Sequence, residues 1–502
     1  PSPSWAEGAT VMRFTGRLRS SGLVAMSRPT RVRVSGSAVT AGMSWSLQKY
    51  LRSQAIYRQP DVPATRDVAW VTVTSGPRIR CTLVVLSMLA LVGCNPQEPA
   101  AGAIHAPSVE WQKCGEIECA TLDVPIDRGS PAFASSPTIA LRAYADRSSV
   151  KGSRHLPLFI HPGGPGADVR SAVLGARTAL APIIDDFDIY ALSTRGTIDG
   201  EHFSCGDFLD ELKDVDIDPE AAKKVARGCN TTSPELVGNI GTRDSAEDLE
   251  QFRIALGFAS VRYLGWSYGA TLGAAWMMTH PDSLRSAVLD APVDPRASWA
   301  GLLSAKSRRG SEEYRRMRSE IGLSEPKLSK MTGREIALAR EYVLYDGGSS
   351  LLSESIKGGE AKFRELVDLR LGVTPEGVDD GGIETQVGVH CSDVSHEEAR
   401  RAIAVTEATP TVGLGATFDR ICLELPGTLR PLSSIPVDKH AVQADAMVIS
   451  TMGDHVVPYE NSIALAKLMR WRHVEVDGRR HLAVGFDPVA TKKAMAFLAS
   501  GD

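Results

Sequence analysis

The sequence predicts an α/β protein with a doubly wound, mostly parallel sheet and an inserted helical cap. Short apolar runs alternate with helical runs between about residues 156 and 290, and the alternation returns between residues 446 and 500. The stretch between these two parts is mostly helical and polar in character. Alternating strands and helices are typical of parallel sheets, because a parallel pair needs a long crossover connection. We therefore expect one sheet domain that is interrupted by a helical insertion.

The individual elements follow from apolar periodicity and from flanking Gly, Pro and capping residues. Within the predicted cap, Thr332 with Glu335 and Ser395 with Glu398 have the spacing of capping boxes, and each pair predicts a helix start. Gly257 is a plausible helix end. The predicted strands lie at residues 120–125, 138–145, 156–160, 187–192, 261–264, 286–290, 446–451 and 473–476, and the predicted helices of the core at 244–255, 268–280, 461–470 and 488–500.

The first part of the chain contains a predicted export signal. Arg78 and Arg80 precede an apolar run at residues 81–93, which is too short for a membrane span and has the layout of a signal peptide. Residues 91–94 resemble a bacterial lipobox, in which Cys94 is lipidated and becomes the mature N-terminus. A plain secretory signal cleaved nearby is the alternative. We expect an exported protein of the cell envelope or periplasm, anchored to the membrane through Cys94 or otherwise secreted.

These observations divide the chain into six parts. Residues 1–72 show no clear periodicity, and we interpret them as a non-native or disordered extension, with translation starting near Val71 or Val73. A signal peptide with the lipobox follows at 73–94 and a linker at 95–108. The sheet domain then occupies 109–295 and 441–502, and the cap occupies 296–440.

Composition and cysteine content narrow the possible classes of protein. Apolar residues make up 43% of the 502 residues, which is typical of a globular protein, and the formal charge of −4 does not suggest a nucleic-acid partner. No cysteine or histidine cluster has zinc-ligand spacing, and we expect neither a metal nor a cofactor. Of the eight cysteines, Cys81 and Cys94 lie in or beside the apolar run at residues 81–93, and the other six allow 15 disulfide connectivities. Buried free thiols in a cytosolic protein are the alternative. Pairing of neighbours is the arrangement we expect: Cys114 with Cys119, Cys205 with Cys229, and Cys391 with Cys422.

Two loops have the chemistry of an acyl-transfer site. Residues 265–269 read Gly-Trp-Ser-Tyr-Gly between a predicted strand and a predicted helix, the setting in which Ser267 would stand exposed on a sharp turn as a nucleophile. An apolar strand also runs directly into His161 and the Gly- and Pro-rich residues 162–166. Such a loop presents a backbone N–H to a developing oxyanion. We expect the oxyanion donors to be the backbone N–H groups of Tyr268 and of Gly164, with Gly163 as the alternative to Gly164.

A serine nucleophile needs an imidazole to take its proton and a carboxylate to orient that imidazole. Two late strands end in loops that carry these groups, Asp454 after the strand at 446–451 and His481 after the strand at 473–476. Parallel strands bring such loops to one edge of the sheet. The order Ser267, Asp454, His481 therefore predicts a catalytic triad.

Other side chains compete for these roles. His455 neighbours the predicted acid rather than following a later strand, and it is the main rival to His481. Asp290 and Asp294 follow an earlier strand and are rival acids. His161 is expected to shape the oxyanion loop.

Several motifs together resemble a known family. They are residues 162–166 (PGGPG), residues 265–269 (GWSYG), and the pair Gly453-Asp454 followed by residues 458–460 (PYE). In this combination the chain resembles the tripeptidyl aminopeptidase-like branch of the α/β-hydrolases, which is related to proline iminopeptidases. The segment at 111–125 and the positions of Cys391 and Cys422 also fit, so the resemblance covers nearly all of residues 108–502.

The resemblance implies a secreted or envelope serine exopeptidase that acts on peptides with a free N-terminus and has a cap that limits access. Two departures bear on substrate preference. The loop at 193–198 (STRGTI) lacks the proline and the second glycine of the family pattern, and His455 stands where the family usually has proline. Neither departure removes a catalytic group.

Two other functions remain open at this point. An esterase or small-molecule acyl hydrolase would use the same triad, because a fold does not define its substrate. A non-catalytic envelope binding protein is the remote alternative. An exopeptidase predicts acidic cap residues near the site, for which the candidates are Glu312, Glu313 and Glu384.

Overall fold

A computed structural model describes most of the chain after residue 108. The predicted extension, the signal peptide with Cys94 and the linker at 95–108 lie outside the described residues. None of the helices within the described part combines the length and the apolarity that crossing a membrane requires. The described residues are 109–129, 136–181, 183–206, 211–212, 218–324, 326–346, 348–371, 382–408, 415–428, 430–437 and 445–500.

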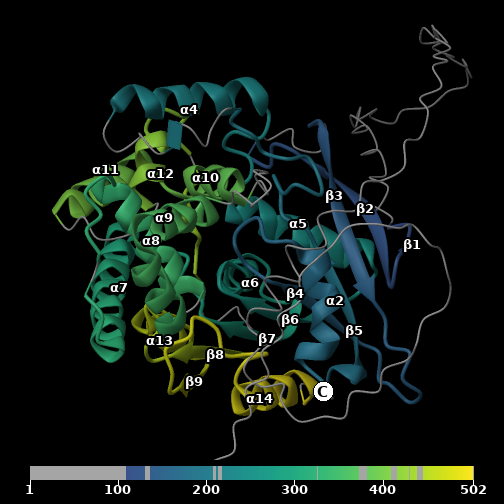
Figure 1. Cartoon of the computed structure of the whole chain (residues 1–502). Helices are drawn as coiled ribbons and strands as arrows, with labels where there is room; N and C mark the ends of the chain where they lie inside the picture. The colour runs from purple at the N-terminus through teal and green to yellow at the C-terminus, as the bar shows by residue number, and fades with distance from the viewer. Residues whose placement is uncertain are drawn as a thin grey trace, which may run out of the picture. The chain divides into compact units, whose positions relative to one another are not determined.

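A nine-stranded mixed sheet forms the centre of this part, in the order β1-β2-β3-β5-β4-β6-β7-β8-β9 (Figure 1). In sheet order, each strand from β1 through β2 and β3 to β5 is antiparallel to its neighbour. The remaining neighbours, in the order β5-β4-β6-β7-β8-β9, are parallel to each other. The chain leaves β4 toward β5 on one side and returns to β6 on the other, so the strand order reverses at β4 and β6. Ligands of open α/β sheets bind at the carboxyl ends of strands at such a reversal. The strands are β1 (Gln112–Cys114), β2 (Ile117–Pro125), β3 (Thr138–Asp146), β4 (Leu156–His161), β5 (Phe187–Leu192), β6 (Val261–Trp266), β7 (Leu284–Asp290), β8 (Asp445–Thr451) and β9 (Arg472–Val476).

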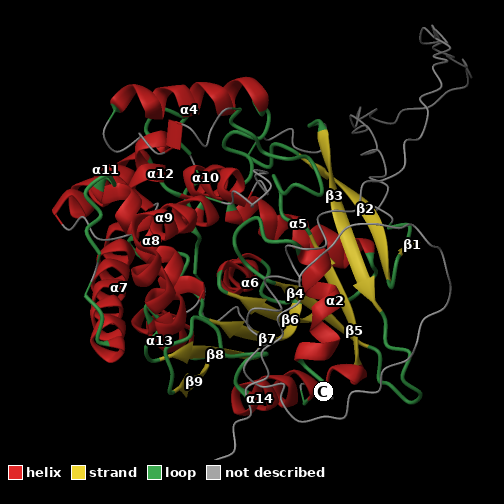
Figure 2. Ribbon diagram, viewed as in Figure 1, coloured by secondary structure: helices red, strands yellow, loops and turns green. Residues whose placement is uncertain are grey.

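Helices cover both faces of the sheet (Figure 2). Successive residues of a strand point to opposite faces. Phe159 accordingly packs in a cluster with α5, α6 and α13, whereas Leu158 and Ile160 pack in a second cluster with α2 and α14. This two-sided burial explains why the parallel strands are apolar throughout, and it confirms the predicted fold class. The helices of the sheet domain are α2 (Val169–Ala179), η2 (Ile183–Asp186), α4 (Pro219–Thr232), α5 (Thr242–Ala255), α6 (Tyr268–Thr279), α13 (Tyr459–Met469) and α14 (Pro488–Ala499).

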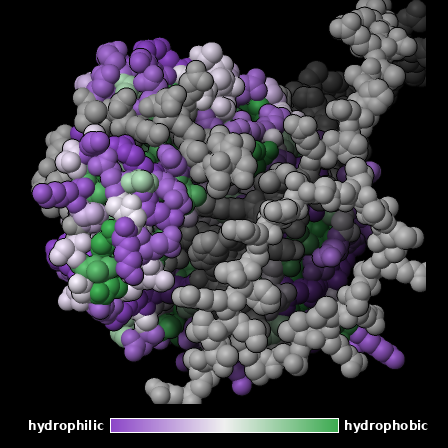
Figure 3. Space-filling view, viewed as in Figure 1, coloured by the Kyte–Doolittle hydropathy of each residue, from purple (hydrophilic) through white to green (hydrophobic). Residues whose placement is uncertain are grey.

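The described residues between β7 and β8 are mostly helical, and their helices gather on one side of the strands in Figure 1. Both predicted capping boxes are present. The Thr332 N–H donates to Glu335 Oε2 (2.7 Å) and the Glu335 N–H donates to Thr332 Oγ1 (3.2 Å), and Ser395 and Glu398 exchange the equivalent bonds. The face seen in Figure 3 is mainly hydrophilic over these helices. They are α7 (Trp299–Ile321), α8 (Gly333–Asp346), α9 (Gly348–Arg370), α10 (Gly382–Asp393), α11 (His396–Ala408), α12 (Gly415–Cys422) and the short η3 (Leu432–Ser434).

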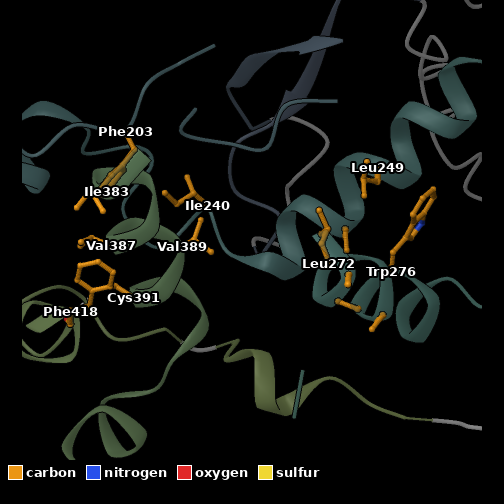
Figure 4. Close-up of a cluster of buried hydrophobic side chains, with 14 of the residues drawn as sticks. Phe203, Ile240, Leu249, Leu272, Trp276, Ile383, Val387, Val389, Cys391 and Phe418 are labelled. Carbon is orange, nitrogen blue, oxygen red and sulfur yellow. Dashed lines mark hydrogen bonds between the residues drawn. The ribbon is translucent and has the colours of Figure 1, made fainter. Parts of the chain in front are cut away.

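The cap and the sheet domain share buried apolar contacts. Figure 4 shows Ile383 of α10 beside Phe203 and Val389 of α10 beside Ile240, and all four belong to one buried cluster. The approach is close, because a Cβ added at Gly388 would lie 2.4 Å from Ile240 Cδ1. The cap is therefore packed onto the core through α10.

Two of the three predicted disulfides are present, Cys205–Cys229 and Cys391–Cys422. The predicted Cys114–Cys119 bond is wrong, because both thiols are free. The hairpin register places Cys114 opposite Ile117 and Cys119 opposite Gln112, so the two cysteines are diagonal neighbours. Diagonal positions have Cα atoms about 7–8 Å apart, beyond the usual span of a disulfide.

Candidate active site

Ser267 lies on a sharp turn between β6 and α6, and its backbone has a conformation that residues other than glycine rarely adopt (φ 55°, ψ −121°). The turn requires glycine on both sides. A Cβ at Gly265 would lie 2.4 Å from the Gly269 carbonyl oxygen, and a Cβ at Gly269 would lie 2.2 Å from the His161 carbonyl oxygen. The Ser267 N–H donates to the Asp290 carbonyl oxygen (2.9 Å), which holds the turn against β7. The strain at Ser267 is thus supported by packing that only glycine permits.

The structure brings Ser267, His481 and Asp454 together. His481 Nε2 lies 2.8 Å from Ser267 Oγ, and His481 Nδ1 lies 2.8 Å from Asp454 Oδ2. Because an ionised carboxylate only accepts hydrogen bonds, Nδ1 carries the proton of a neutral imidazole, and the Ser267 hydroxyl donates to Nε2. Asp454 is 1% exposed, and its other oxygen accepts from the N–H groups of Val456 (2.8 Å) and Val457 (3.0 Å). The carboxylate is therefore held in one orientation.

The loops that carry Asp454 and His481 are joined by backbone contacts. Gly453 N–H donates to the Gly478 carbonyl oxygen (2.9 Å), and a Cβ at Gly453 would lie 2.7 Å from that oxygen. Glycine at position 453 thus allows the loop after β8 to approach the loop after β9. The contact between these two loops keeps the Asp454 carboxylate near the His481 imidazole.

The rival acids have other contacts. Asp290 is completely buried, and its Oδ2 accepts from the N–H groups of Ala483 (2.9 Å) and Val484 (2.7 Å), so it supports the loop that carries His481. Asp294 accepts from the Arg296 N–H (2.9 Å) in the following turn. Among the described residues, Asp454 is the one carboxylate of these three that hydrogen-bonds to the His481 ring.

Burial raises the pKa of Asp290 to about 7, from the ordinary value of 3.8. Between these two values the folded protein holds a proton that the unfolded chain releases, so this group stabilises the fold at low pH and loses that effect as the pH rises toward 7. Asp290→Asn keeps an acceptor for Ala483 and Val484 but cannot ionise. We expect the free energy of unfolding of this variant, relative to wild type, to rise by about 1.4 kcal/mol for each pH unit between pH 5 and 7. Urea denaturation at several pH values measures this, and a difference that does not change with pH would contradict it.

The loop after β4 lies beside the nucleophile. A Cβ at Gly163 would lie 2.5 Å from the Trp266 carbonyl oxygen and 3.2 Å from the Tyr268 nitrogen, and the φ angle of Gly163 is +107°. Its N–H donates to His161 Nδ1 (3.2 Å). Burial lowers the pKa of His161 to about 4, so the imidazole is neutral and can accept this bond. Because the Gly163 N–H is engaged in this way, Gly164 and Tyr268 stay the expected oxyanion donors.

Gly163→Ala is expected to lower kcat by about 10²-fold to 10³-fold, as much as the loss of an oxyanion donor, because the new Cβ would meet the Trp266 backbone and displace the loop that carries the Gly164 N–H. Gly152→Ala is a matched control, since Gly152 also has a positive φ (+86°) but a Cβ there would have nothing within 4 Å. Measuring kcat and thermal stability for both variants separates the effect of the new Cβ on the neighbouring backbone from the effect of the positive φ angle. Equal kcat values for the two variants would contradict the prediction.

Other predicted candidates do not reach the triad. His455 donates from Nε2 to the Leu344 carbonyl oxygen (2.8 Å) in the cap. Glu384 accepts from the Cys205 N–H (2.6 Å), and Glu313 pairs with Arg316 on the same helix. Glu312 is exposed on α7. Within the described ranges, no three His, Cys, Asp or Glu side chains are grouped as metal ligands.

One neighbour of the triad has no recognisable motif in the sequence. The ring of Tyr345, at the end of cap helix α8, lies edge-on to the His481 ring with centroids 6.1 Å apart. Its position in a long helical stretch gave no motif that could have identified it.

Comparisons with known proteins agree with the fold. Residues 157–311 match the family model for the alpha/beta hydrolase fold. The chain is 28% identical over 226 residues to a tripeptidyl aminopeptidase of Streptomyces lividans, a match of 39% of this chain and 40% of the relative. It is 28% identical over 238 residues to the serine protease Hip1 of Mycobacterium tuberculosis (42% and 45%), and 25% identical over 233 residues to carboxylesterase B of the same species (40% and 44%). The matched part is thus less than half the length of each relative.

Proposed function

Because the protein has an α/β-hydrolase fold and joins Ser267, His481 and Asp454 by hydrogen bonds, we propose that it is a serine exopeptidase. It would release di- or tripeptides, or single residues, from peptides with a free N-terminus. The Ser267–His481–Asp454 arrangement carries this proposal, since it supplies the nucleophile, base and orienting acid of acyl transfer. The similarity to a tripeptidyl aminopeptidase and a serine protease supports peptides as the substrate class.

The proposed reaction has two halves. Ser267 Oγ attacks the peptide carbonyl carbon while its proton passes to His481 Nε2, and Asp454 stabilises the imidazolium that forms. The negative oxygen of the tetrahedral intermediate lies between the N–H groups of Tyr268 and Gly164. His481 returns the proton to the departing amine, which leaves an acyl-enzyme. A water molecule, deprotonated by His481, then releases the N-terminal fragment and restores Ser267.

An esterase is the second candidate function, and the similarity to carboxylesterase B supports it. The same triad hydrolyses esters, whose leaving group is an alcohol rather than an amine. A non-catalytic envelope binding protein has less support, because it would not need three side chains in this hydrogen-bonded arrangement.

A substrate panel distinguishes these functions. It contains peptides with free N-termini, the same peptides with acetylated N-termini, and p-nitrophenyl esters, each assayed with wild type and Ser267→Ala. An exopeptidase is expected to cleave the free peptides and to lose activity on the acetylated ones. Turnover of esters alone would exclude the peptidase, and activity that survives in Ser267→Ala would exclude the mechanism.

We also propose that the protein is exported and lipid-anchored through Cys94. The lipobox-like sequence at residues 91–94 supports this location. Two disulfides support it as well, because disulfides persist in oxidising compartments. Cys94→Ser is expected to move the protein from the membrane fraction to the soluble fraction. An unchanged distribution would contradict the anchor.

A further inference from the structure

Three cap helices meet at one buried carboxylate. Glu341 on α8 is 4% exposed and pairs with Lys306 Nζ of α7 (2.9 Å) and Arg370 Nε of α9 (3.2 Å). Burial alone would raise the pKa of Glu341, but the charges of Arg370 and Lys306 lower it below its usual range. The carboxylate therefore stays ionised and holds the three helices together.

Tyr345 follows Glu341 by one turn of α8 and lies between the same two cations. Lys306 Nζ is 5.6 Å from the centre of the Tyr345 ring, and Arg370 Cζ is 5.5 Å from it. Both distances are within the range of a cation–π contact. Tyr345 is 42% exposed, and its ring is the one that lies edge-on to His481. The cluster thus fixes an aromatic side chain against the proposed base.

His455 binds the same turn of α8. It follows Asp454 directly, is 6% exposed, and donates from Nε2 to the carbonyl oxygen of Leu344, the residue before Tyr345. The last carbonyls of a helix have no partner within the helix, so the imidazole satisfies one of them. Burial lowers the pKa of His455, which keeps the ring neutral. Proline at this position, as in the resembling family, could not make this bond.

A cavity of about 150 Å³ lies behind this contact, lined in part by Lys306, Glu341, Tyr345, His455 and Val456. The junction between α8 and the loop of Asp454 is therefore not packed solid. The Lys306–Glu341–Arg370 cluster and the hydrogen bond of His455 are polar contacts that hold this junction, in addition to the apolar side chains that α8 buries elsewhere.

We propose that the last turn of α8 is a positioning element for the triad, in which Tyr345 restrains the His481 ring and His455 ties the turn to the Asp454 loop. This inference rests on the proposed function. Tyr345 and His455 are positioning residues, since they act through His481 and Asp454 rather than on the substrate. The position of the cap is thereby coupled to the geometry of the proposed acid–base pair, whether the substrate is a peptide or an ester.

Substitution of Tyr345 tests the first contact. Tyr345→Leu removes the ring and is expected to lower kcat by about 10-fold to 100-fold with KM changed by less than about 3-fold, because small displacements of reacting groups have effects of this size. Tyr345→Phe keeps the ring and is expected to retain kcat within about 2-fold. Tyr459→Leu is the matched control, since Tyr459 also has a guanidinium over its ring, that of Arg309 at 5.2 Å. Its kcat is expected to equal that of wild type.

Substitution of His455 tests the second contact. His455→Ala removes the donor to Leu344 and is expected to lower kcat by about 10-fold, whereas His455→Gln can still donate and is expected to recover most of the loss. The double variant Tyr345→Leu/His455→Ala is expected to lose about as much as the larger single effect, because both changes release the same turn. Circular dichroism and thermal unfolding of each variant check that the fold is retained.

Two results would overturn this inference: wild-type kcat in both Tyr345→Leu and His455→Ala, or losses that multiply in the double variant. All variants are assayed beside Ser267→Ala on whichever panel substrate wild type turns over. If Ser267→Ala is inactive while Tyr345→Leu and His455→Ala are not impaired, only the positioning role fails. If Ser267→Ala remains active, the proposed function fails.

Discussion

Ser267→Ala is expected to lower kcat by about 10⁵-fold to 10⁶-fold on any peptide or ester that the wild-type protein hydrolyses. In the proposed mechanism this hydroxyl is the nucleophile that His481 activates, and the neighbouring imidazole cannot compensate for its loss. Some acceleration over water should remain, because the backbone N–H groups of Gly164 and Tyr268 still stabilise an oxyanion. His481→Ala is expected to have a similar effect, and the double variant should be little worse than either single one.

Ser462→Ala is a matched control for this experiment. Ser462 is a fully buried serine outside the triad, and its hydroxyl donates to the Pro292 carbonyl oxygen (2.9 Å). Its loss is expected to lower the free energy of unfolding by about 1 kcal/mol and to leave kcat unchanged. Steady-state kinetics and thermal unfolding of both variants measure these effects. More than about 1% of wild-type kcat in Ser267→Ala would refute the assigned nucleophile.

Asp248→Ala is expected to lower the free energy of unfolding by about 3–5 kcal/mol, because it leaves two guanidinium groups without their carboxylate. Arg195 is 0% exposed, and it contacts Asp248 through Nε (2.6 Å) and through its second terminal nitrogen (2.9 Å). It also donates to the carbonyl oxygens of Pro125 (2.6 Å) and Asn239 (2.8 Å). Arg128 pairs with the same carboxylate (2.6 Å). The network joins the loop after β5 to the end of β2 and to α5.

Asp445→Ala is the control, since Asp445 pairs with Arg472 at the same distance of 2.6 Å but the side chains are 48% and 63% exposed. An exposed pair of this kind contributes less than about 1 kcal/mol. Urea denaturation of both variants gives the comparison. If Asp248→Ala were no more destabilising than Asp445→Ala, the buried network would not hold the loop as we describe.

The course of the strands could be predicted because parallel strands are buried on both faces. Strand β5 was predicted at its observed bounds, and β4, β7 and β8 to within two residues. Strand β1 and helices α2 and α4 were not assigned. Gln112 and Lys113 of β1 are exposed, so that strand lacks the apolar run that marks a buried one.

The order of residues along the chain is enough to predict which side chains follow which strands. Ser267, Asp454 and His481 each come after a parallel strand, and such strands end at one edge of a sheet, so the sequence pattern alone predicts that the three side chains lie close together. The order of the strands favours Asp454 over Asp290 as the acid, and the tertiary structure shows why: loop packing turns Asp454 to His481 and Asp290 to the backbone of Ala483. The tertiary structure also decided that Cys114 and Cys119 are diagonal neighbours and that Tyr345 reaches His481 from the cap. Contacts across a sheet register or between distant helices have no local sequence signal, whereas the end of a buried strand does.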